Sequence, residues 1–222
     1  MVYEVNSKKK VFLDSLVLTL LVLIIGFSIG FYFEYFRTNK IIDNYRNNEI
    51  EALDLKLQNY YYQIMDRSSC DSAIAQNFVF ADDLYDKGLE IEKFEEANQI
   101  TDDILLEKRR YVLLKTELWL NTILLKEKCE DPFDTIVYLY SKDTGSFSVS
   151  QQKVISNVLK SVKEKRGNRV ILIPLAGDIG LGAVDLQMNI YNVTSLPSII
   201  INEKIVLEGF HTEEEIESYL KH

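Results

Sequence analysis

The sequence predicts an α/β domain at the C-terminal end of the chain, preceded by a membrane-spanning helix and an all-helical segment. Three observations support this order. An uncharged apolar run occupies residues 15–33. Between Gly30 and Gly88 there is no glycine, and the first proline is Pro132, a composition that favours helices. After Pro132, short β-branched runs alternate with helical patterns, which predicts a mixed sheet covered by helices.

Charge and composition narrow the classes of partner. The 222 residues include 34 acidic and 25 basic side chains, for a net charge of −9. Because nucleic-acid binding needs a basic face, no nucleic acid is predicted as a partner. Only two histidines and two cysteines are present, far apart in the sequence, too few to predict a zinc site. No metal or other cofactor is therefore predicted.

Residues 11–36 are predicted to be a signal anchor in the lipid bilayer. As a helix, the uncharged run 15–33 spans roughly 28 Å, close to one hydrocarbon core. Its far end carries a cluster of aromatic residues typical of a membrane interface, namely Phe31, Tyr32, Phe33, Tyr35 and Phe36. A cleaved signal peptide is the alternative, but the run is too long and no small-residue cleavage site follows it.

The charges on the two sides of this run predict its orientation. Lys8–Lys10 directly precede it, whereas Arg37, Lys40 and Arg46 follow at wider spacing. The positive-inside rule places residues 1–10 in the cytoplasm, and hence the rest of the chain outside the cell membrane. Within the run, Gly26 and Gly30 form a GxxxG motif that would let two helices approach as a homodimer, although glycine is also common in single membrane helices.

Residues 37–130 are predicted to form a helical stalk. The first helix, continuing to about Asp66, has an apolar stripe at three- and four-residue steps, made of Ile50, Leu53, Leu57, Tyr60, Tyr61 and Ile64. For the run 60–62, we expect core packing with one exposed ring, because at most two of three consecutive residues share a helix face. A second helix should end near Gly88 or shortly after, and a third should run from Thr101 to Cys129. A long regular coiled coil would need a steadier heptad.

Cys70 starts the second predicted helix and Cys129 ends the third. If those helices pack antiparallel, the two cysteines lie close together and a disulfide is sterically plausible. Such a bridge fits the predicted external location. Two unrelated buried thiols are the alternative. A catalytic role is disfavoured because a helix C-terminus does not lower the pKa of a thiol.

The last part of the chain, residues 133–222, has the predicted order β-α-β-α-β-β-α. The predicted strands cover residues 135–140, 169–174, 198–201 and 204–210, and the predicted helices cover 149–164, 181–191 and 212–219. The first of these helices should turn one apolar face inward, formed by Val154, Ile155, Val158, Leu159 and Val162. Asn202-Glu203 is short enough for a tight hairpin between the last two strands.

The segment Val193-Thr194-Ser195-Leu196-Pro197-Ser198 resembles the apolar-x-x-apolar-cisPro-Thr loop of the thioredoxin-like fold family, with Ser198 in place of threonine. Gly209 falls where that family commonly ends its last strand. The resemblance covers residues 134–222 and implies a cis Pro197 whose loop faces the family's active site. The whole chain also looks like membrane-anchored archaeal-type thioredoxin-like proteins with a helical stalk.

This chain departs from the family at its reactive cysteines. The family's Cys-x-x-Cys pair opens the helix after the first strand, where the helix dipole stabilises the thiolate. Here that region contains no cysteine, and if Ser146 and Val149 hold the two positions, neither forms a disulfide. Thiol–disulfide catalysis by this domain is therefore not predicted. What remains is a candidate surface for a peptide or protein partner, made of Ser146, Phe147, Ser148, Ser195, Leu196 and Pro197.

Two other functions stay open, an accessory oxidoreductase using Cys70 and Cys129 or a partner's cysteines, and a scaffold without a ligand. Asn192-Val193-Thr194 is a candidate N-glycosylation site. The glycines between 177 and 182 lack the spacing of a phosphate-binding loop and predict a turn. Asp178 with Asp185 as an acid–base pair, and His211 in a catalytic triad, have no support beyond residue type.

Overall fold

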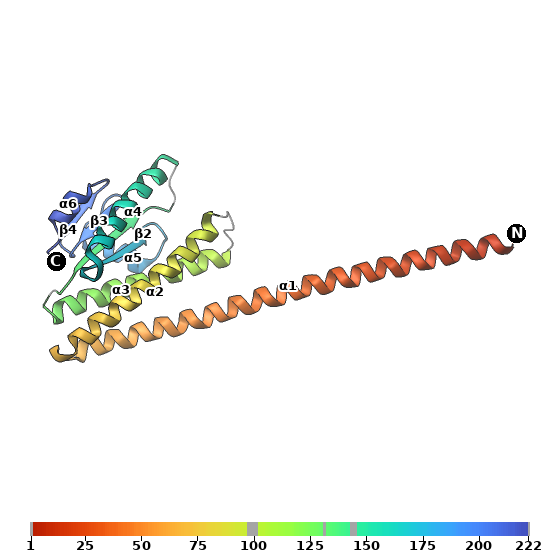
Figure 1. Cartoon of the computed structure of the whole chain (residues 1–222), viewed down its shortest axis with the longest axis horizontal. Helices are drawn as coiled ribbons and strands as arrows, with labels where there is room; N and C mark the ends of the chain where they lie inside the picture. Colours follow the sequence, from red (N-terminus) through yellow and green to blue (C-terminus); the bar gives the residue numbers. More distant parts are fainter. Residues whose placement is uncertain (1, 97–101, 131, 143–145, 222) are drawn as a thin grey trace. The chain divides into compact units, whose positions relative to one another are not determined.

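A computed structural model of the chain describes residues 2–96, 102–130, 132–142 and 146–221, without the side chains of 2–9, 33–48, 51, 90, 92, 94–96, 102–104 and 146–148. The elements follow in the order shown in Figure 1. The helices are α1 (Val2–Ile64), α2 (Cys70–Glu96), α3 (Asp102–Lys128), α4 (Ser146–Arg166), α5 (Gly182–Ile190) and α6 (Glu213–Ser218), with short 3₁₀ turns at Arg67–Ser69 and Gly167–Arg169. The strands are β1 (Asp134–Tyr140), β2 (Val170–Ala176), β3 (Ser198–Ile201) and β4 (Ile205–Glu208).

The chain divides into two compact units, residues 1–51 and 52–222. The first unit contains only the earlier part of helix α1. Its stretch Lys10–Tyr32 has a mean hydropathy of 2.5 and, within the described residues, is the one helix long and apolar enough to cross a membrane. The hydroxyls of Ser15, Thr19 and Ser28 each donate to a carbonyl one turn earlier at 2.8 Å. These polar groups are therefore satisfied within the helix, as a hydrocarbon surrounding requires.

The second unit contains a four-stranded sheet in the order β2-β1-β3-β4. Strands β1 and β2 are parallel and the other two pairings are antiparallel. At the centre, Ile136 of β1 lies opposite Leu172 of β2 and Ile201 of β3. The turn from β3 to β4 contains Asn202 and Glu203, both with positive φ, the conformation that tight hairpin turns require.

Strand β2 lies at one edge of the sheet, and two of its carbonyls accept hydrogen bonds from lysines of neighbouring helices. The carbonyl of Pro174 accepts from Lys115 Nζ of α3 at 2.8 Å, and that of Val170 accepts from Lys163 Nζ of α4 at 2.9 Å. Pro174 itself has no N–H to leave unpaired. Burial lowers the pKa of Lys163, and Asp82 opposes that shift. Together these features reduce the number of pairing sites that this edge offers to another strand.

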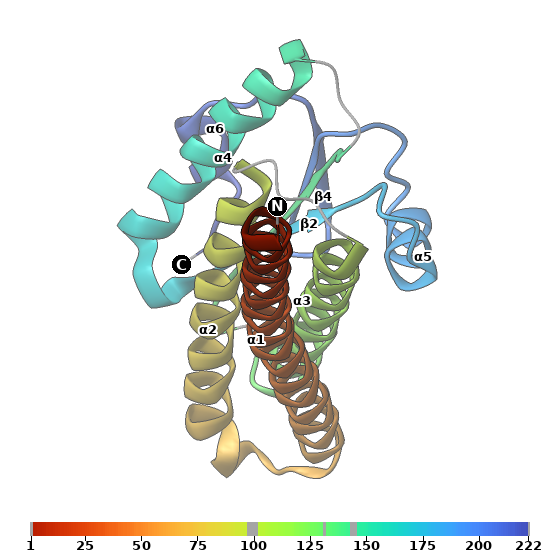
Figure 2. The same cartoon turned by 90° about the vertical axis from the view of Figure 1, so that its right-hand side faces the viewer.

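Both faces of the sheet are covered by helices (Figure 2). On one face, Val137, Ile171 and Ile173 share a core with apolar residues of α2, α3 and α5. On the other face, Ile136 and Tyr138 pack with α4 and α6, and the core of this side is completed by Ile155, Leu159, Val162, Ile199, Ile201 and Ile216. Burial raises the pKa of the Tyr138 phenol. Val154, predicted for the inner face of α4, is half exposed, because it lies one position ahead of Ile155 on the helix.

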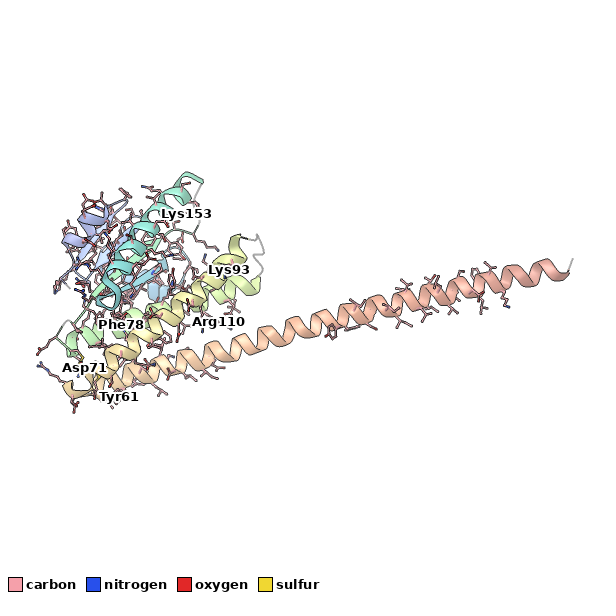
Figure 3. All side chains as sticks on the ribbon, in the orientation of Figure 1. Tyr61, Asp71, Phe78, Lys93, Arg110 and Lys153 are labelled. Atoms are coloured by element: carbon pink, nitrogen blue, oxygen red, sulfur yellow. A yellow bond between two sulfur atoms is a disulfide. The ribbon has the colours of Figure 1, made fainter. Side chains whose placement is uncertain are left out.

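Helix α3 links the helices to the sheet. Trp119 is fully buried in the core that contains the sheet residues, and its ring stacks on Tyr191 at 5.3 Å between centroids. Phe78 of α2, labelled in Figure 3, meets Phe133 edge to face, also at 5.3 Å. Residues of α1, α2, α3 and α5 therefore share one hydrophobic core with one face of the sheet, and α4 and α6 pack on the other face, which explains why residues 52–222 form one unit.

The apolar stripe predicted for the end of α1 is not the face that enters this core. Tyr60 and Tyr61 are 63% and 51% exposed, whereas Leu55 and Tyr62 are buried. The expectation that only one ring of the tyrosine run would be exposed is therefore wrong. Burial and the nearby Asp54 carboxylate raise the pKa of Tyr62 to about 12. The segment has a second apolar face opposite the stripe, and that face packs inward.

Gly88 lies inside α2 rather than near its end. Helix α2 continues to Glu96, eight residues beyond this glycine. A Cβ atom at Gly88 would overlap the hydroxyl of Tyr111 on α3 and lie 2.9 Å from its Cζ atom. Glycine at this position permits a close approach of α2 to α3. In the sequence alone, such a glycine cannot be distinguished from one that ends a helix.

The docking of α6 predicts a loss of stability in acid. Lys165 and then Ser161 of α4 hold the pKa of Glu213 below its ordinary value of 4.5 through hydrogen bonds to its carboxylate. Because the pKa is lower in the folded state, this stabilisation is present above pH 4.5 and is lost as the pH falls below it. We expect acid unfolding of the full chain to move to higher pH in Glu213→Gln, monitored by circular dichroism. Glu214→Gln on the same turn serves as the control, and an equal shift in both variants would contradict the assignment.

Candidate functional site

The predicted loop runs from Asn192 to Pro197, between α5 and β3, and its Leu196–Pro197 peptide bond is cis. The carbonyl of Pro197 accepts from the Gly209 N–H at 2.9 Å, which ties the loop to the end of β4. Ser198 Oγ donates to the Ser195 carbonyl at 2.7 Å. These contacts anchor both sides of the proline and leave Ser195 at the surface.

Leu196 is positioned by a glycine at the end of β2. A Cβ atom at Gly177 would lie 2.9 Å from both Leu196 Cδ atoms and 3.2 Å from Met188 Sδ. The N–H of Gly177 also donates to the Tyr140 carbonyl at 2.8 Å, so the same glycine joins the ends of β1 and β2. The proline loop therefore lies beside the carboxyl ends of the two parallel strands, the edge where α/β sheets commonly bind ligands.

Two side chains hold the segment that leaves β1. Gln152 of α4, nearly buried, accepts from the Ser141 N–H at 2.7 Å and donates to the Ser141 carbonyl at 3.1 Å. Asp178 accepts from the Lys142 N–H at 2.7 Å and from the hydroxyl of Ser141. The first two residues after β1 are thus fixed from both sides before the chain turns toward α4.

The main chain of Leu196 has free hydrogen-bonding capacity. Within the part of the chain that the structure describes, neither its N–H nor its carbonyl has a hydrogen-bond partner. The side chain, in contrast, is packed against Gly177. A fixed residue with an unpaired donor and acceptor is the arrangement by which an extended peptide pairs with a protein backbone.

The predicted partner surface is only partly described. The backbone of Ser146, Phe147 and Ser148 forms the first turn of α4, so the helix begins three residues before the predicted Val149. Their side chains, and residues 143–145, lie outside the described part. The described contacts of the proline loop run to Gly177, Met188 and Gly209. Gln152 and Asp178 were not among the predicted site residues, because their partner Ser141 is 11 and 37 residues away.

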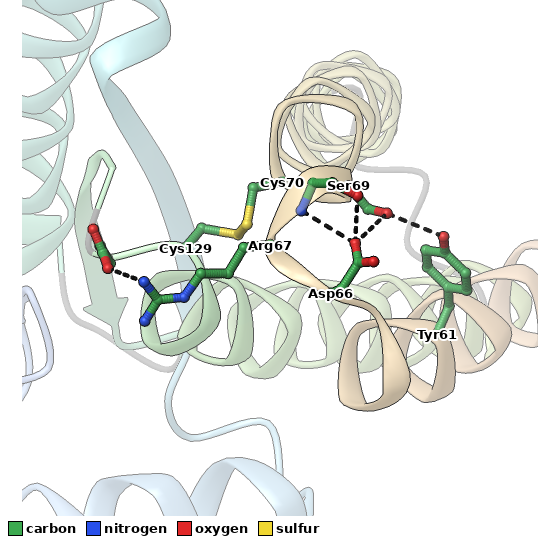
Figure 4. The surroundings of a disulfide bond; sticks show 8 residues. Tyr61, Asp66, Arg67, Ser69, Cys70 and Cys129 are labelled. Carbon is green, nitrogen blue, oxygen red and sulfur yellow. Dashed lines mark hydrogen bonds and ion pairs between the residues drawn. A yellow bond between two sulfur atoms is a disulfide. The ribbon is translucent and has the colours of Figure 1, made fainter.

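The predicted disulfide between Cys70 and Cys129 is present in the structure (Figure 4), with Cα atoms 5.8 Å apart. It connects the start of α2 to the end of α3. An ion pair between Arg67 and Glu130 lies beside it. Asp66 caps the short turn that leads into Cys70, and its hydrogen bonds with Ser68 lower the pKa of the Asp66 carboxyl. Both cysteines of the chain are used in this bridge.

The remaining candidate residues are not assembled into a site. Asn192 is exposed at the end of α5, where its N–H donates to the Asn189 carbonyl at 3.2 Å. The imidazole of His211 contacts the Glu208 carbonyl and the Glu215 carboxylate. Asp178 contacts the β1 segment, whereas Asp185 lies in the first turn of α5. In the described ranges, no group of three or more metal-ligating side chains is gathered.

No protein-family model matches the sequence, and no curated protein does. Similar solved structures include chloroplastic thioredoxin z, at 21% identity over 43% of this chain and 81% of that one, with a TM-score of 0.32. The germline-specific thioredoxin Deadhead from Drosophila melanogaster has 16% identity over 45% and 89% of the two chains, with a TM-score of 0.31. A structure described only as a malarial protein has 16% identity over 39% and 92%, with a TM-score of 0.32.

Proposed function

We propose that this chain is a single-pass membrane protein whose thioredoxin-like domain binds an extended segment of a protein or peptide at the Pro197 loop. The helix Lys10–Tyr32 anchors it, with residues 1–10 in the cytoplasm and the domain outside the cell membrane. The backbone of the bound segment forms hydrogen bonds with the N–H and carbonyl of Leu196, and no thiol chemistry takes part. Homodimerisation through Gly26 and Gly30 stays a prediction.

The observation that carries this proposal is the main chain of Leu196, which has no hydrogen-bond partner among the described residues and lies on an anchored loop. Its side chain is held against Gly177, so the N–H and carbonyl keep a constant direction. Preorganisation of this kind lowers the entropic cost of binding. Gln152 and Asp178 fix the neighbouring segment after β1 at the same edge of the sheet.

The arrangement of the cysteines supports binding rather than thiol exchange. The β1–α4 segment has no cysteine. Cys70 and Cys129 are joined to each other at the junction of two helices. A residue in such a bridge has no thiolate with which to attack a substrate.

A matched pair of glycine variants tests the proposed site. The full chain in lipid nanodiscs is titrated against a panel of fluorescent twelve-residue peptides of varied sequence, without cysteine. Gly177→Ala pushes against Leu196, whereas an added Cβ at Gly182 meets nothing within 4 Å. We expect Gly177→Ala to weaken binding by about tenfold, the effect of losing about one well-formed hydrogen bond. Gly182→Ala should bind as the unmodified chain does.

The outcomes separate the proposed functions. If no peptide in the panel binds, the peptide-binding function is wrong and a scaffold without a ligand remains. If peptides bind but the two glycine variants behave alike, the binding surface lies away from Leu196. A covalent, reductant-sensitive adduct with a cysteine-containing peptide, lost in Cys129→Ala, would instead favour the accessory oxidoreductase.

A further inference from the structure

The last turns of α1, residues 52–64, have two apolar faces, and only one of them is covered by the part of the chain that the structure describes. The inner face carries Leu55 and Tyr62, which are 0% and 2% exposed. Its rotation is fixed by Asn59 Nδ2, which donates to Asn121 Oδ1 of α3 at 2.6 Å. A helix that is apolar on opposite sides is stable when both sides are covered.

The opposite face forms what we call the outer stripe, made of Leu53, Leu57, Tyr60 and Ile64. These side chains are 55%, 65%, 63% and 81% exposed. Because the inner contacts fix the rotation of the helix, the stripe cannot turn inward without breaking the Asn59–Asn121 contact. Tyr61, beside the stripe and labelled in Figure 3, is also exposed and lies 3.4 Å from Ser69 through their hydroxyls.

The spacing of the outer stripe indicates that its partner is another helix. Its members follow one another at steps of four, three and four residues, the alternation of a coiled-coil seam. With Leu57 at an a position, Lys56 falls at g and Tyr61 at the following e. In a parallel pair of identical helices these two positions face each other across the seam. Such a pair would place the Lys56 ammonium of one copy near the Tyr61 ring of the other, a favourable contact.

The size of the stripe also suits a second copy. Together with Tyr61, it exposes on the order of 700 Å², near the roughly 800 Å² per partner buried in a standard interface. Membrane anchoring, on which this step rests, keeps copies parallel and raises their effective concentration. A lipid surface fits less well, because Asp54 lies directly beside Leu53 and the chain is acidic overall.

We propose that the outer stripe of α1 is a homodimer interface, in which two copies pair in parallel through Leu53, Leu57, Tyr60 and Ile64. This contact is separate from the Pro197 loop and from Gly26 and Gly30. Each copy covers the other's second apolar face.

Cysteine crosslinking of the full chain in lipid vesicles tests the pairing. Leu57→Cys places a thiol at the seam, where two copies would bring their thiols together. Val79→Cys on α2 is the control, because Val79 is an apolar residue of similar exposure, 52%, away from the stripe. With mild oxidant, we expect a disulfide-linked dimer of Leu57→Cys and none beyond background for Val79→Cys. Equal crosslinking of both would indicate random collision and overturn the proposal.

A second measurement does not depend on new thiols at the seam. Dilution of donor- and acceptor-labelled chains in vesicles gives the dimer dissociation constant by energy transfer. We expect Leu57→Glu with Ile64→Glu to weaken dimerisation about 100-fold, and Val79→Glu to leave it unchanged. Trp119 fluorescence during denaturation shows whether the variants stay folded.

Three further results would overturn the proposal. The double glutamate variant could dimerise normally, or Gly26→Leu with Gly30→Leu could be the only change that breaks the dimer. An environment-sensitive dye attached to the new thiol of the Leu57→Cys variant could also report burial in lipid, without any crosslink between copies. The last result would assign the outer stripe to the membrane surface instead of a second copy.

Discussion

Removal of the disulfide, in Cys70→Ala with Cys129→Ala, should lower the free energy of unfolding by about 4 kcal/mol. The bridge joins residues 59 apart, and in the chain-entropy model a loop of this length restricts the unfolded chain by about that amount. The bridge also holds the start of α2 to the end of α3, the helix that carries Trp119 into the core. We therefore expect the loss of stability to affect the whole unit 52–222 in one cooperative transition.

The measurement is denaturant unfolding of the full chain in detergent, monitored by its single tryptophan. Trp119 is fully buried against Tyr191, so its emission reports the contact of α3 with α5. Arg67→Ala is the matched control, because it removes only the exposed ion pair beside the bridge, which should cost less than about 1 kcal/mol. Reductant should destabilise the unmodified chain and leave the double variant unchanged. A loss below about 1 kcal/mol in the double variant would show that the bridge does not constrain this unit.

The strands of this chain could be predicted because their signals are local. The runs 135–140 and 169–174 are rich in β-branched, aromatic or other apolar residues, and the structure has strands there. The Pro197 loop was found by the same means, since a proline between a polar turn and an isoleucine run allows few conformations. Local composition predicted the start of α4 less well, because Ser146 and Ser148 favour a loop and yet residues 146–148 form its first turn.

The face of a helix that enters the core could not be predicted from periodicity alone. At the end of α1, the stripe with Leu57 and Tyr60 has a regular period, but so does the opposite side with Leu55 and Tyr62. Tertiary packing chooses between them, through contacts such as Asn59 with Asn121, 62 residues apart. The residues that hold the candidate site were missed for the same reason. Neither Gln152 nor Asp178 lies near Ser141 in the sequence, and only folding brings both to it.

A buried polar network is the basis of the second prediction with a large expected effect on stability. The sequence alone does not reveal this network. Lys126 of α3 is 8% exposed, and its Nζ donates to Asn202 Oδ1 at 2.7 Å and to Glu203 Oε2 at 3.2 Å. Asn202 in turn donates from Nδ2 to Asp134 Oδ1 at 2.6 Å and accepts from the Thr135 N–H at 3.0 Å. The network thus joins α3, the start of β1 and the β3–β4 turn.

Lys126→Met should lower the free energy of unfolding by about 3 kcal/mol, because loss of the ammonium leaves buried acceptors without their donor. Methionine keeps most of the apolar stem, so the loss reports the charge rather than a cavity. The test is denaturant unfolding followed by Trp119, whose Nε1 donates to Glu203 Oε1 at 3.2 Å and therefore also senses the network. Lys128→Met, two residues along the same helix and exposed, is the control and should change stability by less than about 1 kcal/mol.

A double variant separates the charge interaction from a general loss of packing. If Lys126 stabilises the fold by neutralising Glu203, then adding Glu203→Gln to Lys126→Met should recover part of the loss, since the amide no longer presents an unpaired charge. We expect a coupling of about 1 kcal/mol or more between the two positions, as residues in one hydrogen-bond network show. Strictly additive losses would mean that the two side chains act independently and would contradict a stabilising charge interaction between them.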